Sequence, residues 1–191
     1  MRRFVRNRGA LTLAAFLVVV PLQAQKSKDK GGTAVNSGAS AQDRITREVR
    51  HELVMLPYYG VFDNLAYRVD GSSVTLLGQV TRPALKNDAG NVVKGIEGVE
   101  RVDNKIEVLP PSPIDDGIRR AEYGAIYGHP GLDRYAMQAV PPIHIIVANG
   151  KVTLEGVVAT QSDKDLAGIR ANGVSGVFSV ANNLRLDSDK N

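Results

Sequence analysis

The apolar positions of the chain follow first a helical and then a strand period, which predicts the opening elements of a small α/β domain. Between residues 43 and 56, apolar side chains recur every three or four positions, which indicates a helix that ends before Pro57. The segments 65–69 and 74–80 alternate between apolar and polar residues, with the turn residues 70–73 between them. These two segments are therefore predicted to form a β-hairpin.

A second helix and a last strand are predicted to complete this unit. Pro83 suits the first turn of a helix, and apolar residues at helical spacing follow it as far as Ile96. Gly90 lies inside this helix at a cost of about 1 kcal/mol relative to alanine. Residues 99–108 return to a two-residue period and are predicted to form a strand. The same order then recurs, with a helix over 114–127, a hairpin of 143–147 and 152–158, a helix over 162–174 and a strand over 177–186.

The recurrence is also visible residue by residue. With a shift of 78 positions and no gap, residues 74–108 match residues 152–186 at 13 of 35 positions. Alternate residues from Val74 share one strand face, so each copy buries the same strip beneath its helices, and the glycine in that strip indicates a close backbone approach. The repeated asparagines lie where their side chains can bond to backbone. Six repeated residues are assigned to this structural motif: Gly78, Gly98, Asn104, Gly156, Gly176 and Asn182.

The repeated pattern is Val-Thr-Leu-x-Gly-x-Val, then a helix, then Gly-Val-x-x-Val-x-Asn-x-Leu/Ile, and it resembles the BON domain (bacterial osmotically inducible and nodulation). It stands as 74-VTLLGQV-80 with 98-GVERVDNKI-106, and as 152-VTLEGVV-158 with 176-GVFSVANNL-184. The resemblance implies an α+β fold of two tandem αββαβ domains, each with a three-stranded mixed sheet packed on two helices.

Pattern and composition together divide the chain into five parts. The division is a signal peptide over 1–24, a flexible tether over 25–42, a first BON-like domain over 43–110, a proline-rich linker over 111–114 and a second BON-like domain over 115–188. The second copy departs from the pattern, because its first helix is poor in large apolar residues and contains Gly124, and a segment over 133–142 is added. These departures indicate either an altered geometry or a binding surface.

The first 24 residues have the layout of a secretory signal. Arg2, Arg3, Arg6 and Arg8 precede an apolar run from Leu11 to Val20, which at about ten residues is too short to span a bilayer. Cleavage is predicted after Ala24, and an uncleaved amino-terminal anchor is the alternative. The chain has no cysteine, which excludes disulfides, thiol catalysis and a lipidated cysteine anchor.

The basic balance of the chain comes from this signal. Four of the 24 basic residues lie in residues 1–24, which contain none of the 20 acidic residues, so the remainder carries 20 of each and is neutral. The sequence pI of 9.4 is therefore a property of the signal. Electrostatic capture of nucleic acid loses its main support, and no nucleic-acid partner is expected.

No catalytic or metal-binding pattern is found in the sequence. His51, His129 and His144 are widely separated and lack metal-ligand spacing, and no nucleophile elbow or phosphate-binding loop occurs. Asp115 and Asp116 stand at the start of a helix, where acids cap the helix and stabilise its dipole. The chain is therefore expected to be non-enzymatic, with no cofactor and no metal.

Aromatic and basic side chains near the first helix of each copy are the candidate contacts with a lipid or a protein partner. Tyrosine anchors at membranes and interfaces, and arginine binds lipid phosphates, while core packing is the alternative for the aromatic residues, Phe62 in particular. The candidates are Tyr58, Tyr59, Arg119, Arg120, Tyr123, Tyr127 and Arg134, with Tyr135 nearby.

The resemblance implies a periplasmic protein, often peripheral at the outer membrane, that binds phospholipid or an envelope partner and supports envelope integrity under stress. An anionic phospholipid membrane or an envelope protein is accordingly the expected partner. The alternative is a structural or assembly module that docks onto an envelope protein complex. A stable protein complex without lipid affinity would distinguish the alternative.

Overall fold

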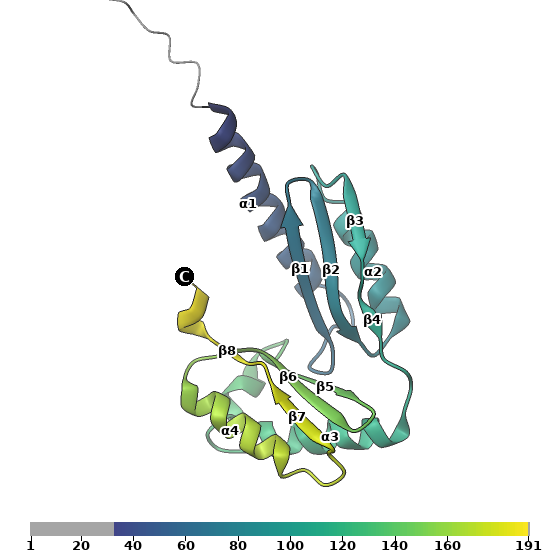
Figure 1. The fold of residues 1–191 in the computed structure, drawn as a ribbon, viewed down its shortest axis with the longest axis vertical. Helices are drawn as coiled ribbons and strands as arrows, with labels where there is room; N and C mark the ends of the chain where they lie inside the picture. The colour runs from purple at the N-terminus through teal and green to yellow at the C-terminus, as the bar shows by residue number, and fades with distance from the viewer. Residues whose placement is uncertain (1–32, 191) are drawn as a thin grey trace, which may run out of the picture. The chain divides into compact units, whose positions relative to one another are not determined.

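The computed structural model describes residues 33–190, which fall in one compact unit; the predicted signal peptide and residues 25–32 of the predicted tether lie outside the described residues. The elements run twice through the order helix, two strands, helix, two short strands (Figure 1). The first repeat comprises α1 (Thr33–Val54), β1 (Asn64–Asp70), β2 (Ser73–Val80), α2 (Pro83–Lys94), β3 (Arg101–Asn104) and β4 (Glu107–Val108). The second comprises α3 (Pro113–Tyr127), the 3-10 helix η1 (Asp133–Met137), β5 (Ile143–Ala148), β6 (Lys151–Val158), α4 (Gln161–Asn172), β7 (Ser179–Asn182), β8 (Arg185–Leu186) and the 3-10 helix η2 (Asp187–Lys190).

Each repeat contains a mixed sheet whose central strand is the second strand of the hairpin. β1 is antiparallel to β2, and β3 and β4 both run parallel to β2. β5, β6, β7 and β8 repeat this arrangement around β6. The predicted fold class, two tandem αββαβ domains with mixed sheets, is thus confirmed.

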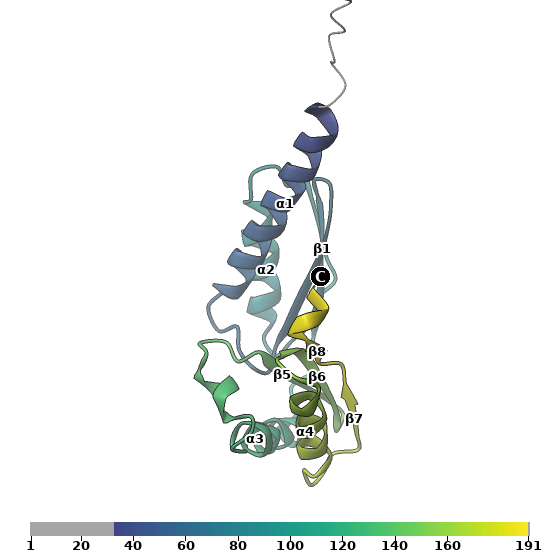
Figure 2. The same cartoon turned by 90° about the vertical axis from the view of Figure 1, so that its left-hand side faces the viewer.

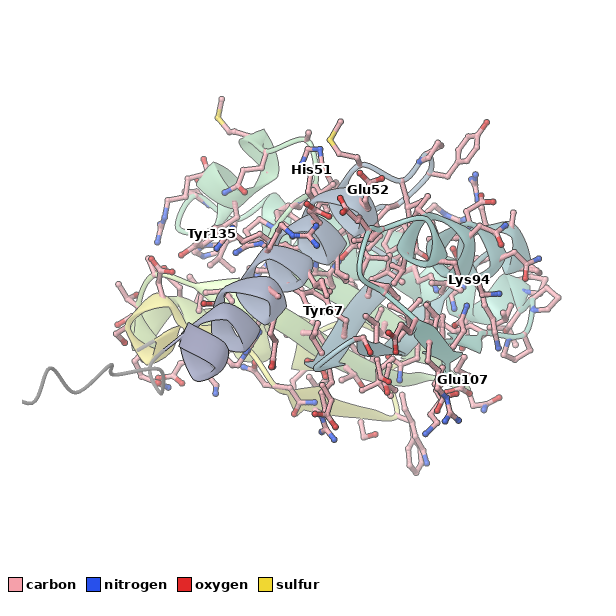
Figure 3. All side chains as sticks on the ribbon, turned by 90° about the horizontal axis from the view of Figure 1, so that it is seen from above. His51, Glu52, Tyr67, Lys94, Glu107 and Tyr135 are labelled. Carbon is pink, nitrogen blue, oxygen red and sulfur yellow. The ribbon has the colours of Figure 1, made fainter. Side chains whose placement is uncertain are left out.

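The two helices of each repeat lie on one face of its sheet, which Figure 2 shows in side view. In the first repeat the apolar stripe of α1 at Ile45, Val49 and Leu53 is buried against the strip from β2, in which Leu76 is fully buried. The hydroxyl of Tyr67 on β1 donates to the carbonyl of Thr46 on α1 (Figure 3). Burial of these apolar side chains is the main contribution to holding helix and sheet together.

The single last strand predicted for each repeat is two short strands. An asparagine whose side chain bonds to backbone stands at the end of the first. The Asn104 side chain donates to the carbonyl of Lys86 on α2 at 2.8 Å and accepts from the amide of Ile106 at 3.2 Å, so the chain leaves the ladder between β3 and β4. A Cβ at Gly90 would lie 2.8 Å from the Asn104 amide nitrogen. Glycine is therefore present in the helix because the asparagine side chain packs against its backbone.

The glycine in the buried strip marks a close backbone approach, as its position predicted. Gly78 has φ +110°, and a Cβ there would lie 2.0 Å from the carbonyl oxygen of Asn64. Gly156 has φ +120°, with the carbonyl oxygen of Pro142 in the same place. A larger residue at either position would collide with the neighbouring strand.

One predicted helix start is wrong, and a second helix begins one residue earlier than predicted. α1 begins at Thr33 rather than at Asp43, so residues 33–42 are helical rather than a flexible tether. Extending a helix already anchored by an apolar face costs little per residue, which allows a polar segment to continue it. α3 begins at Pro113, inside the predicted linker, because the Ser112 side chain accepts from the amide of Asp115 and caps the helix.

Candidate functional site

The first helices of the two repeats can be compared position by position. A Cβ at Gly98 would meet the side chain of Ile45, and a Cβ at Gly176 would meet that of Ile118. Ile118 of α3 therefore corresponds to Ile45 of α1. This correspondence shows where the second repeat differs from the first at the same place in the fold.

Two of the candidate contact residues are buried, and their assignment to a binding surface is corrected. Arg119 is 5% exposed, and its guanidinium donates to the carbonyl of Val147 on β5 at 2.6 Å and pairs with Asp116. Tyr127 is also 5% exposed, and its hydroxyl donates to the carbonyl of Ile143. Both side chains are buried and hydrogen-bond α3 to the edge strand β5, so neither is available to a membrane.

Tyr58 and Arg134 lie on the surface but at separate places. Tyr58 is exposed, and the guanidinium of Arg82 lies over its ring at 4.9 Å from the centroid. Arg134 is half-exposed and forms an ion pair with the buried Asp163 at 2.6 Å. The arginine is thus already paired with a carboxylate of its own repeat.

Arg120 and Tyr123 come together with two residues of the first repeat around a pocket of about 320 Å³. Val61 and Phe62, from the segment between α1 and β1, form its other walls and also pack against the core of the second repeat. The rings of Phe62 and Tyr123 meet edge to face at 6.4 Å. Phe62 is therefore a packing residue and a wall of the pocket at once.

The remaining candidate is Tyr59. It lies where the segment between α1 and β1 meets β5 of the second repeat, a contact that we call the joint. Its ring stacks on His144 of β5 with centroids 5.5 Å apart, and the amide of Ile145 donates to the carbonyl of Val61 at 2.8 Å. Burial raises the pKa of Tyr59 to about 12 and lowers the pKa of His144. Both groups are thus held neutral at the joint, where a wider groove of about 960 Å³ also opens.

Buried aspartates fix the turns next to this site, and sequence reasoning did not assign them that role. Asp63 accepts from the amide and hydroxyl of Thr81 at 2.7 and 2.9 Å. Asp115 accepts from the amides of Asn149 and Gly150 at 3.0 and 2.8 Å. Burial opposes ionisation of Asp115, but these hydrogen bonds outweigh it and lower its pKa. Asp63 gave no signal in the sequence, and Asp115 was assigned with Asp116 to the start of the helix rather than to a contact so distant in sequence.

The added segment is attached to the second repeat through Tyr135, a buried residue of η1 (Figure 3). Its hydroxyl donates to Asp163 at 2.9 Å and accepts from the amide of Ala159 at 2.8 Å. In the repeat alignment Asp163 stands where the first repeat has the buried Leu85. The segment is therefore held by a polar network at a position that is apolar in the first repeat.

Glu122 is fully buried on α3, and neither carboxylate oxygen has a hydrogen-bond partner among the described residues. Burial raises its pKa to about 7. By the correspondence of Ile118 with Ile45, Glu122 takes the place of Val49. The sequence contains a pattern that indicates burial of Glu122, because this residue stands midway between Ile118 and Ile126 at the spacing of the apolar helix face.

Residues 33–190 contain no cluster of three or more histidine or acidic side chains that could hold a metal ion. Within the same part of the chain, no helix combines the length and the apolar character that a membrane span requires.

Comparison with known proteins gives the following matches. The family model of the BON domain matches residues 41–110 and 132–188, so its second match begins after α3. Osmotically-inducible protein Y of Escherichia coli (strain K12) is 30% identical over 179 residues, with 85% of this chain and 84% of that protein covered. The solved structure of CdsD, a structural protein of the type III secretion system of Chlamydia trachomatis, has 11% identity and a TM-score of 0.30, covering 75% of this chain and 92% of that one. A structure of the CdsD C-terminal domain has 12% identity and a TM-score of 0.26, covering 73% and 96%.

Proposed function

The chain belongs to the BON domain family, and from this we propose that it is an exported, periplasmic protein that binds phospholipid membrane surfaces without catalysing a reaction. The relationship to an osmotically inducible protein supports a role in envelope integrity under stress. In this proposal the protein is peripheral, most simply at the outer membrane, and residues 1–24 are the signal that exports it.

The pocket formed by Val61, Phe62, Arg120 and Tyr123 is the observation that carries the membrane proposal. Its walls are mostly apolar, and Arg120 is exposed and forms no ion pair with the described residues. An apolar pocket with a free guanidinium at its edge matches a phospholipid, because the guanidinium binds the phosphate while the pocket receives apolar carbon. Tyr123 adds a ring with an apolar body and a polar tip, which suits the membrane interface.

The phosphate contact contributes modestly by itself. One arginine near an anionic surface contributes about 1 kcal/mol, so a membrane contact needs further apolar burial or a second site. A second contact elsewhere on the same chain would raise the apparent affinity through effective concentration. The protein is therefore expected to bind vesicles weakly through each contact and detectably through both.

Co-sedimentation with anionic vesicles tests the pocket. Arg120→Glu should lower the bound fraction several-fold at low salt, because it places a like charge against the phosphates. The matched control is Arg47→Glu, since Arg47 is the exposed residue that corresponds to Arg120 on α1. Equal loss in both variants would contradict a specific role of the pocket. If the wild type binds no vesicles, cross-linking in the periplasm should instead capture the envelope protein complex of the alternative function.

A further inference from the structure

Three segments of the second repeat meet beside Gly150. The amide of Phe178, in the loop between α4 and β7, donates to the carbonyl of Gly150 at 2.8 Å. Asp115 at the start of α3 accepts from the amide of Gly150. The loop, the β5–β6 turn and the beginning of α3 therefore lie together (Figure 1). We call this region the tip and define it as Ile114, residues 149–151 and residues 173–178.

The tip exposes large apolar side chains that nothing in the described chain covers. Phe178 is 80% exposed and Ile114 is 76% exposed. The hydrogen bonds of Gly150 hold both residues on the same end of the repeat. Isolated exposed apolar residues are common, but one on the first turn of α3 and one on a loop bonded to the same turn indicate a contact surface.

The first repeat has the same backbone hydrogen bond at this place, but with a charged side chain where the second repeat has an apolar one. There the amide of Glu100 donates to the carbonyl of Ser72 at 2.9 Å, as that of Phe178 does to Gly150. Glu100 and Phe178 are equivalent at the shift of 78 positions. Ile114, four residues before Ile118, corresponds to Ala41, four residues before Ile45. Fold requirements therefore do not explain the apolar side chains of the tip, because the same loop forms with a glutamate.

The loop of the second repeat also carries no charge. Residues 171–181 contain no acidic or basic residue, whereas the equivalent residues 93–103 contain Lys94, Glu97, Glu100, Arg101 and Asp103. Lys151, next to the turn and paired in register with Ser179, is the one basic residue of the tip, and the two acids that follow Ile114 are engaged by the turn amides and by Arg119. A charge within the apolar part of a bilayer is costly, and a lysine at its edge reaches the phosphates.

We propose that the tip of the second repeat inserts into a phospholipid membrane, with Phe178 and Ile114 among the upper acyl carbons and Lys151 at the phosphates. This proposal rests on the proposed membrane function and adds to the pocket beside Arg120 a second surface that contacts the membrane. A lipid surface fits better than a protein partner, because protein interfaces retain a polar and charged rim around their apolar centre. The loop itself is uncharged, the carboxylate of Asp115 beside it is bonded to the turn amides of Asn149 and Gly150, and Asp116 is paired with Arg119.

The absence of tryptophan from the chain allows a direct test. In Phe178→Trp the single indole should shift its emission to the blue on mixing with vesicles of anionic phospholipid, and brominated acyl chains should quench it. The control is Met137→Trp, because Met137 is 87% exposed but lies beyond the opposite end of α3. Its emission should not change. Equal behaviour of the two indoles would overturn the proposal.

A charge placed at the tip gives the second test. Phe178→Glu installs the side chain of the first repeat and should lower the vesicle partition coefficient about 10- to 100-fold, the scale of losing one buried aromatic side chain. Met137→Glu should leave the partition coefficient unchanged. Both variants should unfold at the wild-type temperature, because both side chains are exposed.

The outcomes separate the tip from the membrane function. Vesicle binding by the wild type that Phe178→Glu does not weaken would leave the membrane function standing and overturn the tip as its anchor. Absence of wild-type binding to any vesicle would overturn both. Capture of a protein by a photo-cross-linker at position 178, without any capture of lipid, would also overturn the tip as a membrane anchor.

Discussion

Glu122 stands in the second repeat where Val49 stands in the first, and both side chains are fully buried. The isoleucines four residues earlier, Ile118 and Ile45, make equivalent contacts with Gly176 and Gly98. In the paired second helix, Ala171 replaces Val93 at the shift of 78 positions, and both are again fully buried. A longer carboxylate on one helix thus accompanies a shorter side chain on the other.

Replacing this carboxylate should stabilise the protein above neutral pH. Between the ordinary glutamate pKa of 4.5 and the folded pKa of about 7, the folded state binds more protons than the unfolded state, so stability falls as pH rises through that window. Glu122→Gln should therefore gain up to about 3 kcal/mol at pH 8 and much less at pH 5. Urea unfolding at both values measures it. The exposed Glu107→Gln is the control (Figure 3), and a pH-independent gain would contradict the prediction.

His144 should give the opposite pH dependence at the joint. Its pKa is lowered by burial, so the unfolded state binds its proton first, and stability is lost as pH falls through the ordinary value of 6.5 toward the lowered one. His144→Gln should flatten this acid slope of unfolding when it is measured in a Glu122→Gln background. The exposed His51→Gln should leave the slope unchanged (Figure 3). An unchanged slope in His144→Gln would show that this residue does not titrate differently in the two states.

The strand glycines should not tolerate a methyl group. Gly156→Ala places its Cβ on the carbonyl oxygen of Pro142 at a φ of +120°, so a loss of several kcal/mol or failure to fold is expected. Gly124→Ala is the control, because a Cβ there meets nothing within 4 Å, and it should stabilise α3 by up to about 1 kcal/mol. Thermal unfolding measures both. Wild-type stability of Gly156→Ala would contradict the close approach of the two strands.

Removing one hydroxyl should loosen the added segment. Tyr135→Phe deletes the bonds to Asp163 and to the amide of Ala159, which leaves buried groups unsatisfied and should cost about 1–3 kcal/mol. Hydrogen exchange at the Ala159 amide should accelerate with it. Tyr58→Phe, at an exposed ring, should change neither quantity. Unaltered exchange in Tyr135→Phe would mean that the segment is held by other contacts.

The sequence was sufficient for the fold because the signals were local. The period of apolar positions fixed the element types, and the repeated glycine at 78 and 156 indicated the close strand approach that the structure contains. The sequence was insufficient where a feature depends on residues far away along the chain. The start of α1 at Thr33 was missed because composition alone does not show that a helix anchored further along can extend.

The candidate site was predicted less well for a related reason. Arg119 and Tyr127 have residue types typical of surfaces, but each bonds to a carbonyl of β5 that is remote in sequence. The pocket beside Arg120 is formed by segments of both repeats, so neither repeat read alone contains it. Phe178 is exposed because of the geometry of its loop. From the sequence alone, an apolar residue next to a strand would be assigned to the core.

Flotation of the purified protein with vesicles through a density gradient tests whether this BON-domain chain binds phospholipid surfaces as proposed. Vesicles of neutral and of anionic phospholipid are compared at low and at moderate salt. The protein is expected to float with anionic vesicles, less so at moderate salt because the arginine and lysine contacts are screened, and little with neutral ones. Protein that stays at the bottom of the gradient under all four conditions would contradict the claim.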